Sequence, residues 1–226
     1  MAAHEQRCFA MSAQIPPDHV DMHYMSKGAL ETHHLRGYDA VFFGGSGAYS
    51  VLDPVPWIQE GIVALQRVVD ARVPAWASCF GFQGLAVAMG GAVRRDDAAT
   101  EMGSTQLTLT EAGQQDPLMG TLPNPFWAQE GHHDRVVTVP EGVVELARSE
   151  RCPEQAFKVV GAPFWASQFH PELDAARTKD RFVYYRTHYF TGDDAEADAQ
   201  LRLIESGITT PEVNHLLALL IRGGFS

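Results

Sequence analysis

Apolar runs alternate with amphipathic segments along the first half of the chain. The run from Asp39 to Phe43 leads into four small residues, 44–47, which is typical of a buried strand followed by a glycine-rich loop. From Trp57 to Ala71 apolar residues recur at spacings of four, three and four, which predicts a helix with one buried face. Val73–Ser78 then predicts a second strand, and Phe80–Met89 predicts a second helix. Strand, helix, strand and helix in this order indicate βαβ units and a parallel sheet.

The second half of the chain changes character. Thr105–Thr110, Arg135–Val139 and Pro163–His170 predict further strands without long helices between them, so we expect a mixed sheet. Two helical stretches close the chain, around Ala175 to Phe190 and from Pro211 to Ile221. Both are expected to cover the sheet.

The N-terminal segment does not fit this pattern. An α/β chain should open with a strand of aliphatic residues, yet residues 1–19 offer only Cys8–Met11 and Ile15. The first predicted strand is Val20–Met25. The expected opening strand is therefore missing or poorly formed: either the fold begins one element late, or the true start lies upstream.

Composition narrows the class of protein. The 226 residues carry 17 Lys and Arg against 28 Asp and Glu, a net charge of −11. This balance argues against binding to nucleic acid or to acidic membrane surfaces, both of which require basic patches. No apolar run of about 18 residues exists to span a bilayer, and residues 1–7 lack the apolar core that is expected of a signal peptide. Since no linker divides the sequence, we expect a single domain over residues 1–226.

The chain has three cysteines: Cys8, Cys79 and Cys152. Their odd number and wide spacing favour a reducing compartment, so the expected location is the cytoplasm. Only Cys79 lies where a strand should end and a helix begin. A nucleophile on such a turn is pushed out of the sheet edge, and the helix N-terminus favours the thiolate. A packed core cysteine is the alternative, and it is the interpretation we keep for Cys8 and Cys152.

A histidine and a carboxylate follow the last predicted strand, at His170 and Glu172. Residues i and i+2 of an extended segment point to the same side, so the two side chains can be neighbours. A carboxylate beside one ring nitrogen fixes the tautomer while the other nitrogen exchanges a proton. Cys79, His170 and Glu172 together would make a nucleophile, a base and an orienting acid.

The glycine-rich loop at residues 44–47 supplies a third element. Glycines let backbone N–H groups approach a ligand oxygen, as an oxyanion hole requires, although a simple turn or a phosphate cradle is also compatible with the loop. The nucleotide-binding patterns G-x-x-x-x-G-K-[ST] and G-x-G-x-x-G are both absent, so nucleotide binding has little support.

These pieces together resemble the class I glutamine amidotransferase family, whose glutaminase domain carries a Cys-His-Glu triad. The resemblance runs from about Tyr38 to Glu172 and rests on an ordered set of short motifs: Gly44–Gly47, Ala77–Gln83, Met89–Gly91, Glu101–Gly103, Asp116–Leu118, His132–Asp134, Gln155–Phe157 and Gln168–Glu172. It implies an α/β fold, flavodoxin-like, with a mixed, mostly parallel sheet and helices on both faces. The chain departs from the family pattern at Ala77, where glycine is usual, and at Ser46, where proline is usual.

The resemblance also implies roles for individual residues. Cys79 would be the nucleophile, His170 the general acid and base, and Glu172 its orienting group. The backbone N–H groups of Gly45 and Phe80 would form the oxyanion hole.

Gln83 and Gly44 would bind the substrate by the same resemblance. The expected activity is hydrolysis of the glutamine side-chain amide through a thioester on Cys79, without a cofactor. The chain would work alone or pass the ammonia to a separate synthase subunit, because only 54 residues follow Glu172 (226 − 172 = 54) and they leave no room for an attached synthase.

Alternatives stay open at this point. A γ-glutamyl hydrolase or peptidase would use the same triad on a larger γ-glutamyl compound, and a non-catalytic binding protein could keep the fold. The adjacent pairs His33–His34 and His132–His133 do not predict a metal site, because neighbouring side chains diverge on a helix or a strand. Within the family resemblance, His132 and Asp134 are interpreted as structural residues near the pocket.

Overall fold

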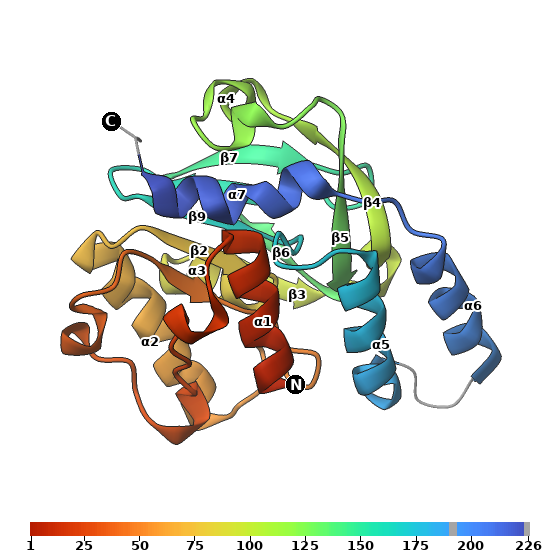
Figure 1. Cartoon of the computed structure of the whole chain (residues 1–226), viewed down its shortest axis with the longest axis horizontal. Helices are drawn as coiled ribbons and strands as arrows, with labels where there is room; N and C mark the ends of the chain where they lie inside the picture. The colour runs from red at the N-terminus through yellow and green to blue at the C-terminus, as the bar shows by residue number, and fades with distance from the viewer. Residues whose placement is uncertain (190–193, 224–226) are drawn as a thin grey trace.

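A computed structural model of the chain, which describes residues 1–189 and 194–223, contains a seven-stranded mixed sheet (Figure 1). Its strands are, in spatial order, β1 (Val41–Phe43), β2 (Ala75–Ser78), β9 (Phe164–Ser167), β8 (Ala156–Val159), β7 (Val143–Arg148), β4 (Glu101–Leu109) and β5 (Phe126–His132). β1, β2 and β9 are parallel to one another, and the remaining neighbours are antiparallel. β3 (Ala92–Arg95) and β6 (Asp134–Thr138) form a separate antiparallel ribbon. The expected mixed sheet is therefore confirmed.

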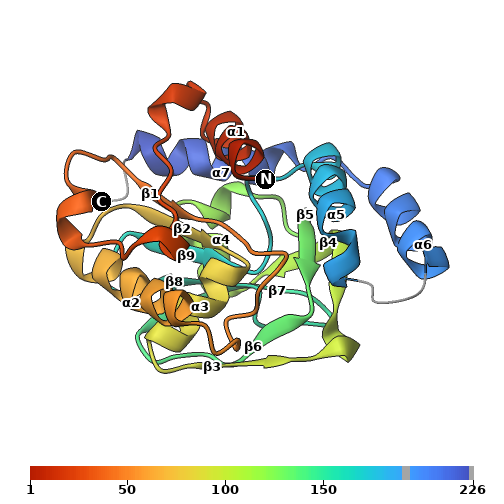
Figure 2. The same cartoon turned by 90° about the horizontal axis from the view of Figure 1, so that it is seen from below.

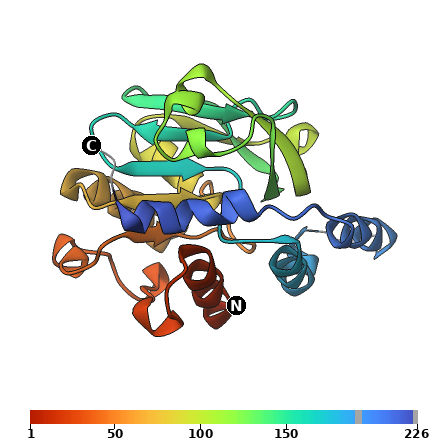
Figure 3. The same ribbon diagram turned by 45° about the horizontal axis from the view of Figure 1, so that its top comes forward.

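Helices cover both faces of the parallel part of the sheet (Figure 2). α2 (Pro56–Ala71) and α3 (Phe80–Ala88) lie on one face, and α1 (Ala2–Ala13) and α7 (Pro211–Arg222) pack together on the other. Figure 3 shows α7 stretched along the sheet beside α1. α5 (Ala175–Tyr189) and α6 (Asp194–Glu205) pack on each other and reach β4, and α4 (Glu111–Gln115) caps β7. Short 3₁₀ turns lie at Pro17–His19, Met25–Lys27, Thr32–Leu35, Asp97–Ala99 and Met119–Thr121.

The core has two halves, one on each face of the sheet. Neighbouring residues of a strand point to opposite faces, so Trp165 packs toward α1 and α7 while Phe164 packs toward α2 and α3. Both side chains are fully buried. This explains why the strands β2 and β9 are apolar without alternation: neither face meets water.

The N-terminal segment opens with a helix and corrects one expectation. The residues around Cys8 and Phe9 form part of helix α1, in which both side chains are buried. Val20–Met25, predicted as a strand, is not one, although Val20 (φ −111°, ψ 103°) and Tyr24 (φ −97°, ψ 105°) have extended backbones. The prediction is wrong because a strand exists only when it pairs with a neighbour, and no strand of the described residues pairs with this segment.

The C-terminal region contains one helix more than the two that the sequence predicts. The acidic residues Asp194, Glu196 and Asp198 fall in the first turns of α6, where carboxylates favour a helix start. Phe190, expected to end the preceding helix, lies outside the described residues. None of the helices in the described ranges combines the length and the apolar composition that crossing a membrane requires.

Candidate active site

Cys79 lies at the turn that joins β2 to α3. Its backbone has φ 50° and ψ −101°, a conformation that is rare for a residue with a side chain. Hydrogen bonds hold it there: the Cys79 N–H donates to the carbonyl of Ser167 (2.8 Å), and the Cys79 carbonyl accepts from the N–H of Gln83 (2.9 Å). A side chain at Gly81 would place its Cβ 2.8 Å from Cβ of Phe43. The turn therefore has the sharp geometry that is expected of a nucleophile elbow.

His170 and Glu172 are held side by side just after β9. The His170 Nδ1–H donates to Oε1 of Glu172 at 2.7 Å, and both side chains are buried. The hydroxyl of Ser78 donates to the other carboxylate oxygen of Glu172 at 2.9 Å. The backbone N–H of His170 donates to the carbonyl of Gln129 at 2.9 Å. The neighbouring positions predicted from the i and i+2 spacing are present.

The glycine-rich loop brings the cysteine and the histidine together. A Cβ built on Gly45 would lie 2.7 Å from Cε1 of His170 and 3.5 Å from Cβ of Cys79. Only a glycine fits this contact with the imidazole. Gly44 is packed on its other side, against the carboxylate of Glu5 from α1.

The electrostatics of the site are dominated by burial. Burial raises the pKa of Cys79 to about 12, and the nearby Arg181 guanidinium is the largest opposing influence. Burial likewise lowers the pKa of His170, against the pull of Glu172. For Glu172, burial acts to raise the pKa, but His170 and Arg181 outweigh it and the pKa lies below its ordinary value. Burial therefore favours the thiol of Cys79 and the neutral imidazole of His170, and it opposes the thiolate that the helix N-terminus favours.

The cavity beside Cys79 is small. Its volume is about 20 Å³, room for roughly one water molecule. α5 and α6 cover it with Thr178, Arg181, Phe182 and Ile204. The sequence does not single out this cover, because the residues that form it belong to no motif.

Two charged residues that the sequence does not single out reach this cavity. Nη1 of Arg181 lies 3.3 Å from Oε1 of Glu172, and its Nη2 lies 3.9 Å from Oε1 of Glu5. Glu130 lines the cavity with Cys79 and is 1% exposed. Neither carboxylate oxygen of Glu130 has a hydrogen-bond partner among the described residues. The guanidinium of Arg181 and the carboxyl group of Glu130 thus lie beside Cys79, and no sequence motif predicts either of them.

Comparison with known proteins identifies the family. The family model described as "Glutamine amidotransferase class-I" matches residues 17–188, which is more than half of the chain. The chain belongs to the class I glutamine amidotransferase family. The family expected from the sequence is thereby confirmed.

Relatives of this amidotransferase include proteins named for GMP synthesis. A subunit of the glutamine-hydrolyzing GMP synthase from Sulfolobus acidocaldarius is 33% identical over 139 residues, which cover 62% of this chain and 70% of the relative. The corresponding protein from Methanocaldococcus jannaschii is 32% identical over 123 residues, 54% of this chain and 63% of the relative. The match to the GMP synthase of Porphyromonas gingivalis covers 26% of that longer protein. The chain therefore spans less than two thirds of the length of some of these relatives.

Solved structures show the same fold. A glutamine amido transferase from Methylobacillus flagellatus superposes with a TM-score of 0.70 over 95% of this chain and 87% of that chain, at 22% identity. A glutamine amidotransferase from Thermotoga maritima gives a TM-score of 0.62 over 84% and 80%, at 19% identity. The expected flavodoxin-like fold with helices on both faces is confirmed.

Gln83 does not line the small cavity beside Cys79. Its side-chain amide is buried and donates to the carbonyl of Asp134 (2.9 Å) and to Oε1 of Gln168 (3.1 Å). Gly44 and Phe80, together with Gly45, line a larger cavity on the other side of the loop, while Ser46 lines both cavities. Of the residues predicted to be catalytic, to form the oxyanion hole or to bind substrate, Cys79 and His170 line the small cavity.

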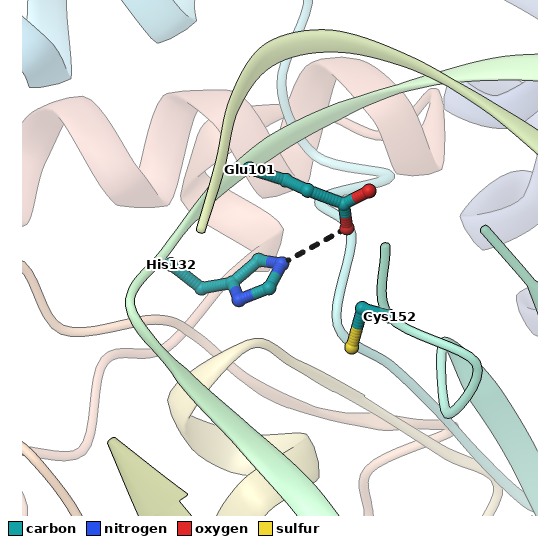
Figure 4. A group of neighbouring side chains, drawn as sticks. All are labelled: Glu101, His132 and Cys152. Carbon is teal, nitrogen blue, oxygen red and sulfur yellow. Dashed lines mark hydrogen bonds and ion pairs between the residues drawn. The ribbon is translucent and has the colours of Figure 1, made fainter. Parts of the chain in front are cut away.

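A buried cluster lies beyond Glu130. Glu101, His132 and Cys152 have donor atoms within 4.8 Å of one another, and Figure 4 shows the Glu101 carboxylate bonded to His132 with Cys152 beside them. These side chains are of kinds that bind zinc. Hydrogen bonds already occupy two of them: His132 bonds through Nδ1 to the carbonyl of Asp134 (3.0 Å) and through Nε2 to Glu101 (3.2 Å), and Gln155 donates to Glu101 (2.5 Å). The spacing of the histidine pair does not predict this group, because its members come from three separate segments.

Proposed function

We propose that this amidotransferase hydrolyses the side-chain amide of glutamine through a γ-glutamyl thioester on Cys79. One observation carries the proposal: the strained turn at Cys79, the His170–Glu172 pair and the Gly45 loop converge within contact distance. Acyl transfer needs a nucleophile, a base that a carboxylate orients, and a stretch of backbone that no side chain covers.

The proposed reaction begins with the neutral groups that burial favours. His170, whose Nδ1–H is held by Glu172, takes the thiol proton of Cys79 on its other nitrogen as the sulfur attacks the amide carbon. The N–H groups of Gly45 and Phe80 hold the oxyanion. His170 then gives its proton to the departing ammonia, leaving the thioester. A water molecule, deprotonated by His170, releases glutamate and restores the thiol.

Gln83 and Gly44 complete the proposed substrate site. Gln83 lies one helical turn after Cys79, and its backbone N–H already bonds to the Cys79 carbonyl. Gly44 precedes the proposed oxyanion donor and leaves no room for a side chain beside Glu5. Both would act by fixing the backbone against which the glutamyl group lies.

The ammonia has a proposed recipient in a separate synthase subunit. Support comes from two relatives whose names describe them as subunits of GMP synthase rather than as the whole enzyme. An acidic chain without a membrane-crossing helix in its described residues fits a cytoplasmic partner of this kind.

A labelling experiment tests the nucleophile. The purified protein is incubated with a glutamine-mimicking electrophile and weighed by mass spectrometry. We expect one label on the wild type, the same label on Cys8→Ala, and none on Cys79→Ala. Undiminished labelling of Cys79→Ala would remove the assignment.

Product analysis then separates the remaining functions. We expect ammonia release from glutamine to exceed glutamate release from γ-glutamyl peptides. Equal or faster turnover of the peptides would show a γ-glutamyl hydrolase instead. A labelled but inactive protein on both substrates would favour a binding role.

A further inference from the structure

Four buried side chains meet beside the strand pair β4–β5: Glu101, Glu130, His132 and Cys152. Glu101 and His132 are directly opposite each other in the strand register, so their side chains lie on one face of the pair. Glu130 precedes His132 by two residues on β5 and therefore points to the same face. Cys152 comes from the turn between β7 and β8, where three hydrogen bonds to Ser149 hold its backbone. We call these side chains the four-residue group, and Figure 4 shows three of them.

The ring of His132 has a lone pair on the nitrogen that faces the group. Its Nδ1 lies 3.0 Å from the carbonyl oxygen of Asp134, and because a carbonyl only accepts, Nδ1 carries the hydrogen. In the neutral ring Nε2 is then an acceptor, and it lies 3.2 Å from Oε2 of Glu101 and 3.7 Å from Oε2 of Glu130. Ionised carboxylates also only accept. The facing atoms therefore need a cation or a proton between them.

Glu130 separates these two possibilities. A proton shared by His132 and Glu101 would satisfy that pair, but neither carboxylate oxygen of Glu130 has a hydrogen-bond partner among the described residues. Burying a carboxyl group without such partners is costly. A cation held within the four-residue group would contact this carboxylate as well. Glu130 therefore favours a cation over a shared proton.

The kinds and the spacing of the ligand atoms fit zinc. Sulfur, imidazole nitrogen and carboxylate oxygen are the ligands that zinc takes in proteins, whereas magnesium and calcium take oxygen. Zinc bonds of about 2.0–2.3 Å in a tetrahedron place ligand atoms roughly 3.2–3.8 Å apart. The two distances from Nε2 of His132, 3.2 and 3.7 Å, fall in this range. Sγ of Cys152 lies within 4.8 Å of the ligand atoms of Glu101 and His132, so a shift of about 1 Å completes the tetrahedron.

The surroundings of the group suit a metal site. The hydrogen bonds from His132 to the Asp134 carbonyl (3.0 Å) and from Gln155 to Glu101 (2.5 Å) are of the kind that orients metal ligands from outside. A cavity of about 1300 Å³ reaches from the exposed Arg95 to Glu101. This cavity gives an ion a route to the group.

We propose that the four-residue group binds one zinc ion, Zn²⁺, as a structural site. Protein side chains take all four positions, which leaves none for water or substrate. Coordination releases two protons, one from the Cys152 thiol and one from the carboxyl group of Glu130, which keeps its proton in the metal-free protein because burial raises its pKa. The ion would join β4, β5 and the turn after β7 behind the wall of the Cys79 cavity, which Glu130 also lines.

The first test uses the full chain after a chelator has removed any bound metal. Titration with Co²⁺, a coloured substitute for zinc, should saturate at one ion per chain, with the strong visible bands of a tetrahedral site and a sulfur-to-cobalt charge-transfer band. Cys152→Ala should lose the charge-transfer band, whereas Cys8→Ala and Cys79→Ala should keep it. No such band in the wild type, or an unchanged band in Cys152→Ala, would overturn the proposal. So would loss of the band in Cys79→Ala, which would place the ion at the nucleophile.

The second test measures zinc binding itself. At a free concentration of 100 times its Kd, Zn²⁺ should raise the Tm of the wild type by about 5–10 °C. Glu130→Gln keeps the size of the side chain, and its zinc affinity should fall by at least about 10-fold in competition with a chelator. The exposed Glu141→Gln is the matched control and should keep the wild-type affinity. Wild-type affinity in Glu130→Gln, or no rise in the Tm of the wild type, would contradict the four-ligand site. These readouts do not depend on catalysis, so a failure here is distinct from a failure of the proposed function.

Discussion

Gly45 is the residue at which the proposed oxyanion loop meets the imidazole. A methyl group there would lie 2.7 Å from Cε1 of His170, so Gly45→Ala must displace either the ring or the loop. Because the loss of one oxyanion donor costs about 10²- to 10³-fold in turnover, we expect ammonia release from glutamine to fall by that factor. Gly28→Ala, where nothing lies within 4 Å, is the matched control and should keep full activity. Wild-type turnover in Gly45→Ala would remove the loop from the mechanism.

Glu172 is fully buried and holds His170 through a 2.7 Å hydrogen bond. Glu172→Gln keeps the shape of the side chain but loses the charge that fixes the imidazole tautomer. We expect kcat for glutamine hydrolysis to fall by roughly 10²- to 10⁴-fold. The exposed Glu141→Gln should behave as the wild type in the same assay. A change in KM alone would assign Glu172 to substrate binding.

Local sequence patterns identify some of these site residues and miss others. Cys79, His170 and Glu172 are predictable because a strand end, a helix start and an i, i+2 spacing are visible along the chain. Arg181 and Glu130 are not, since they reach the cavity from α5 and β5 only after long stretches of chain have packed together. The burial that raises the pKa of Cys79 could not be predicted either, because burial of the whole site is a property of the fold.

At the scale of elements, α5 presents Arg181 to the site. The guanidinium lies 3.3 Å from Glu172 and acts to lower the pKa of both Cys79 and His170. Arg181→Met should therefore raise the pH at which Cys79 reacts with a thiol-directed alkylating agent, measured as rate against pH. Arg181→Lys keeps the charge, so its pH profile should lie between those of the wild type and of Arg181→Met.

A matched substitution controls for the loss of an arginine from α5. Arg186 pairs with Asp194 and Asp198 at the surface. Arg186→Met should leave the pH profile of Cys79 alkylation unchanged. If Arg181→Met also leaves it unchanged, the guanidinium has no electrostatic role at the nucleophile.

Several elements that the apolar patterns predict are packed on the sides that those patterns assume. α2, α3, β2 and β9 follow their apolar patterns because each is covered as the pattern assumes. The segment from Val20 to Met25 has the composition of a strand, yet pairing decides strand formation and no described strand pairs with it. α1 is missed because most of its buried residues are small or polar, which leaves its apolar pattern weak.

For the whole molecule, Glu130 couples stability to pH. Burial, and after it the charge of Glu101, raises its pKa well above the ordinary value. Between the unfolded and the folded pKa the native state holds a proton that the unfolded state has lost. The contribution of Glu130 to the free energy of unfolding is therefore fully present at low pH. It falls as pH rises, by at most about 1.4 kcal/mol per pH unit.

Glu130→Gln removes this titration without changing the size of the side chain. We expect the variant to gain free energy of unfolding relative to the wild type as pH rises from about 5 to about 9, measured by urea unfolding at each pH. For Glu141→Gln, the difference from the wild type in the free energy of unfolding should stay constant over this pH range. A constant difference for Glu130→Gln as well would mean that the carboxyl group is ionised in the folded protein.

The small cavity at Cys79 has a kinetic consequence. A space of about 20 Å³ cannot hold glutamine, so the side chains that line it from α5 and α6, among them Arg181 and Phe182, must move before the substrate reaches the sulfur. Under the proposed mechanism this rearrangement precedes every turnover, so the rate should fall in viscous solvent in proportion to the share of each cycle that the rearrangement takes.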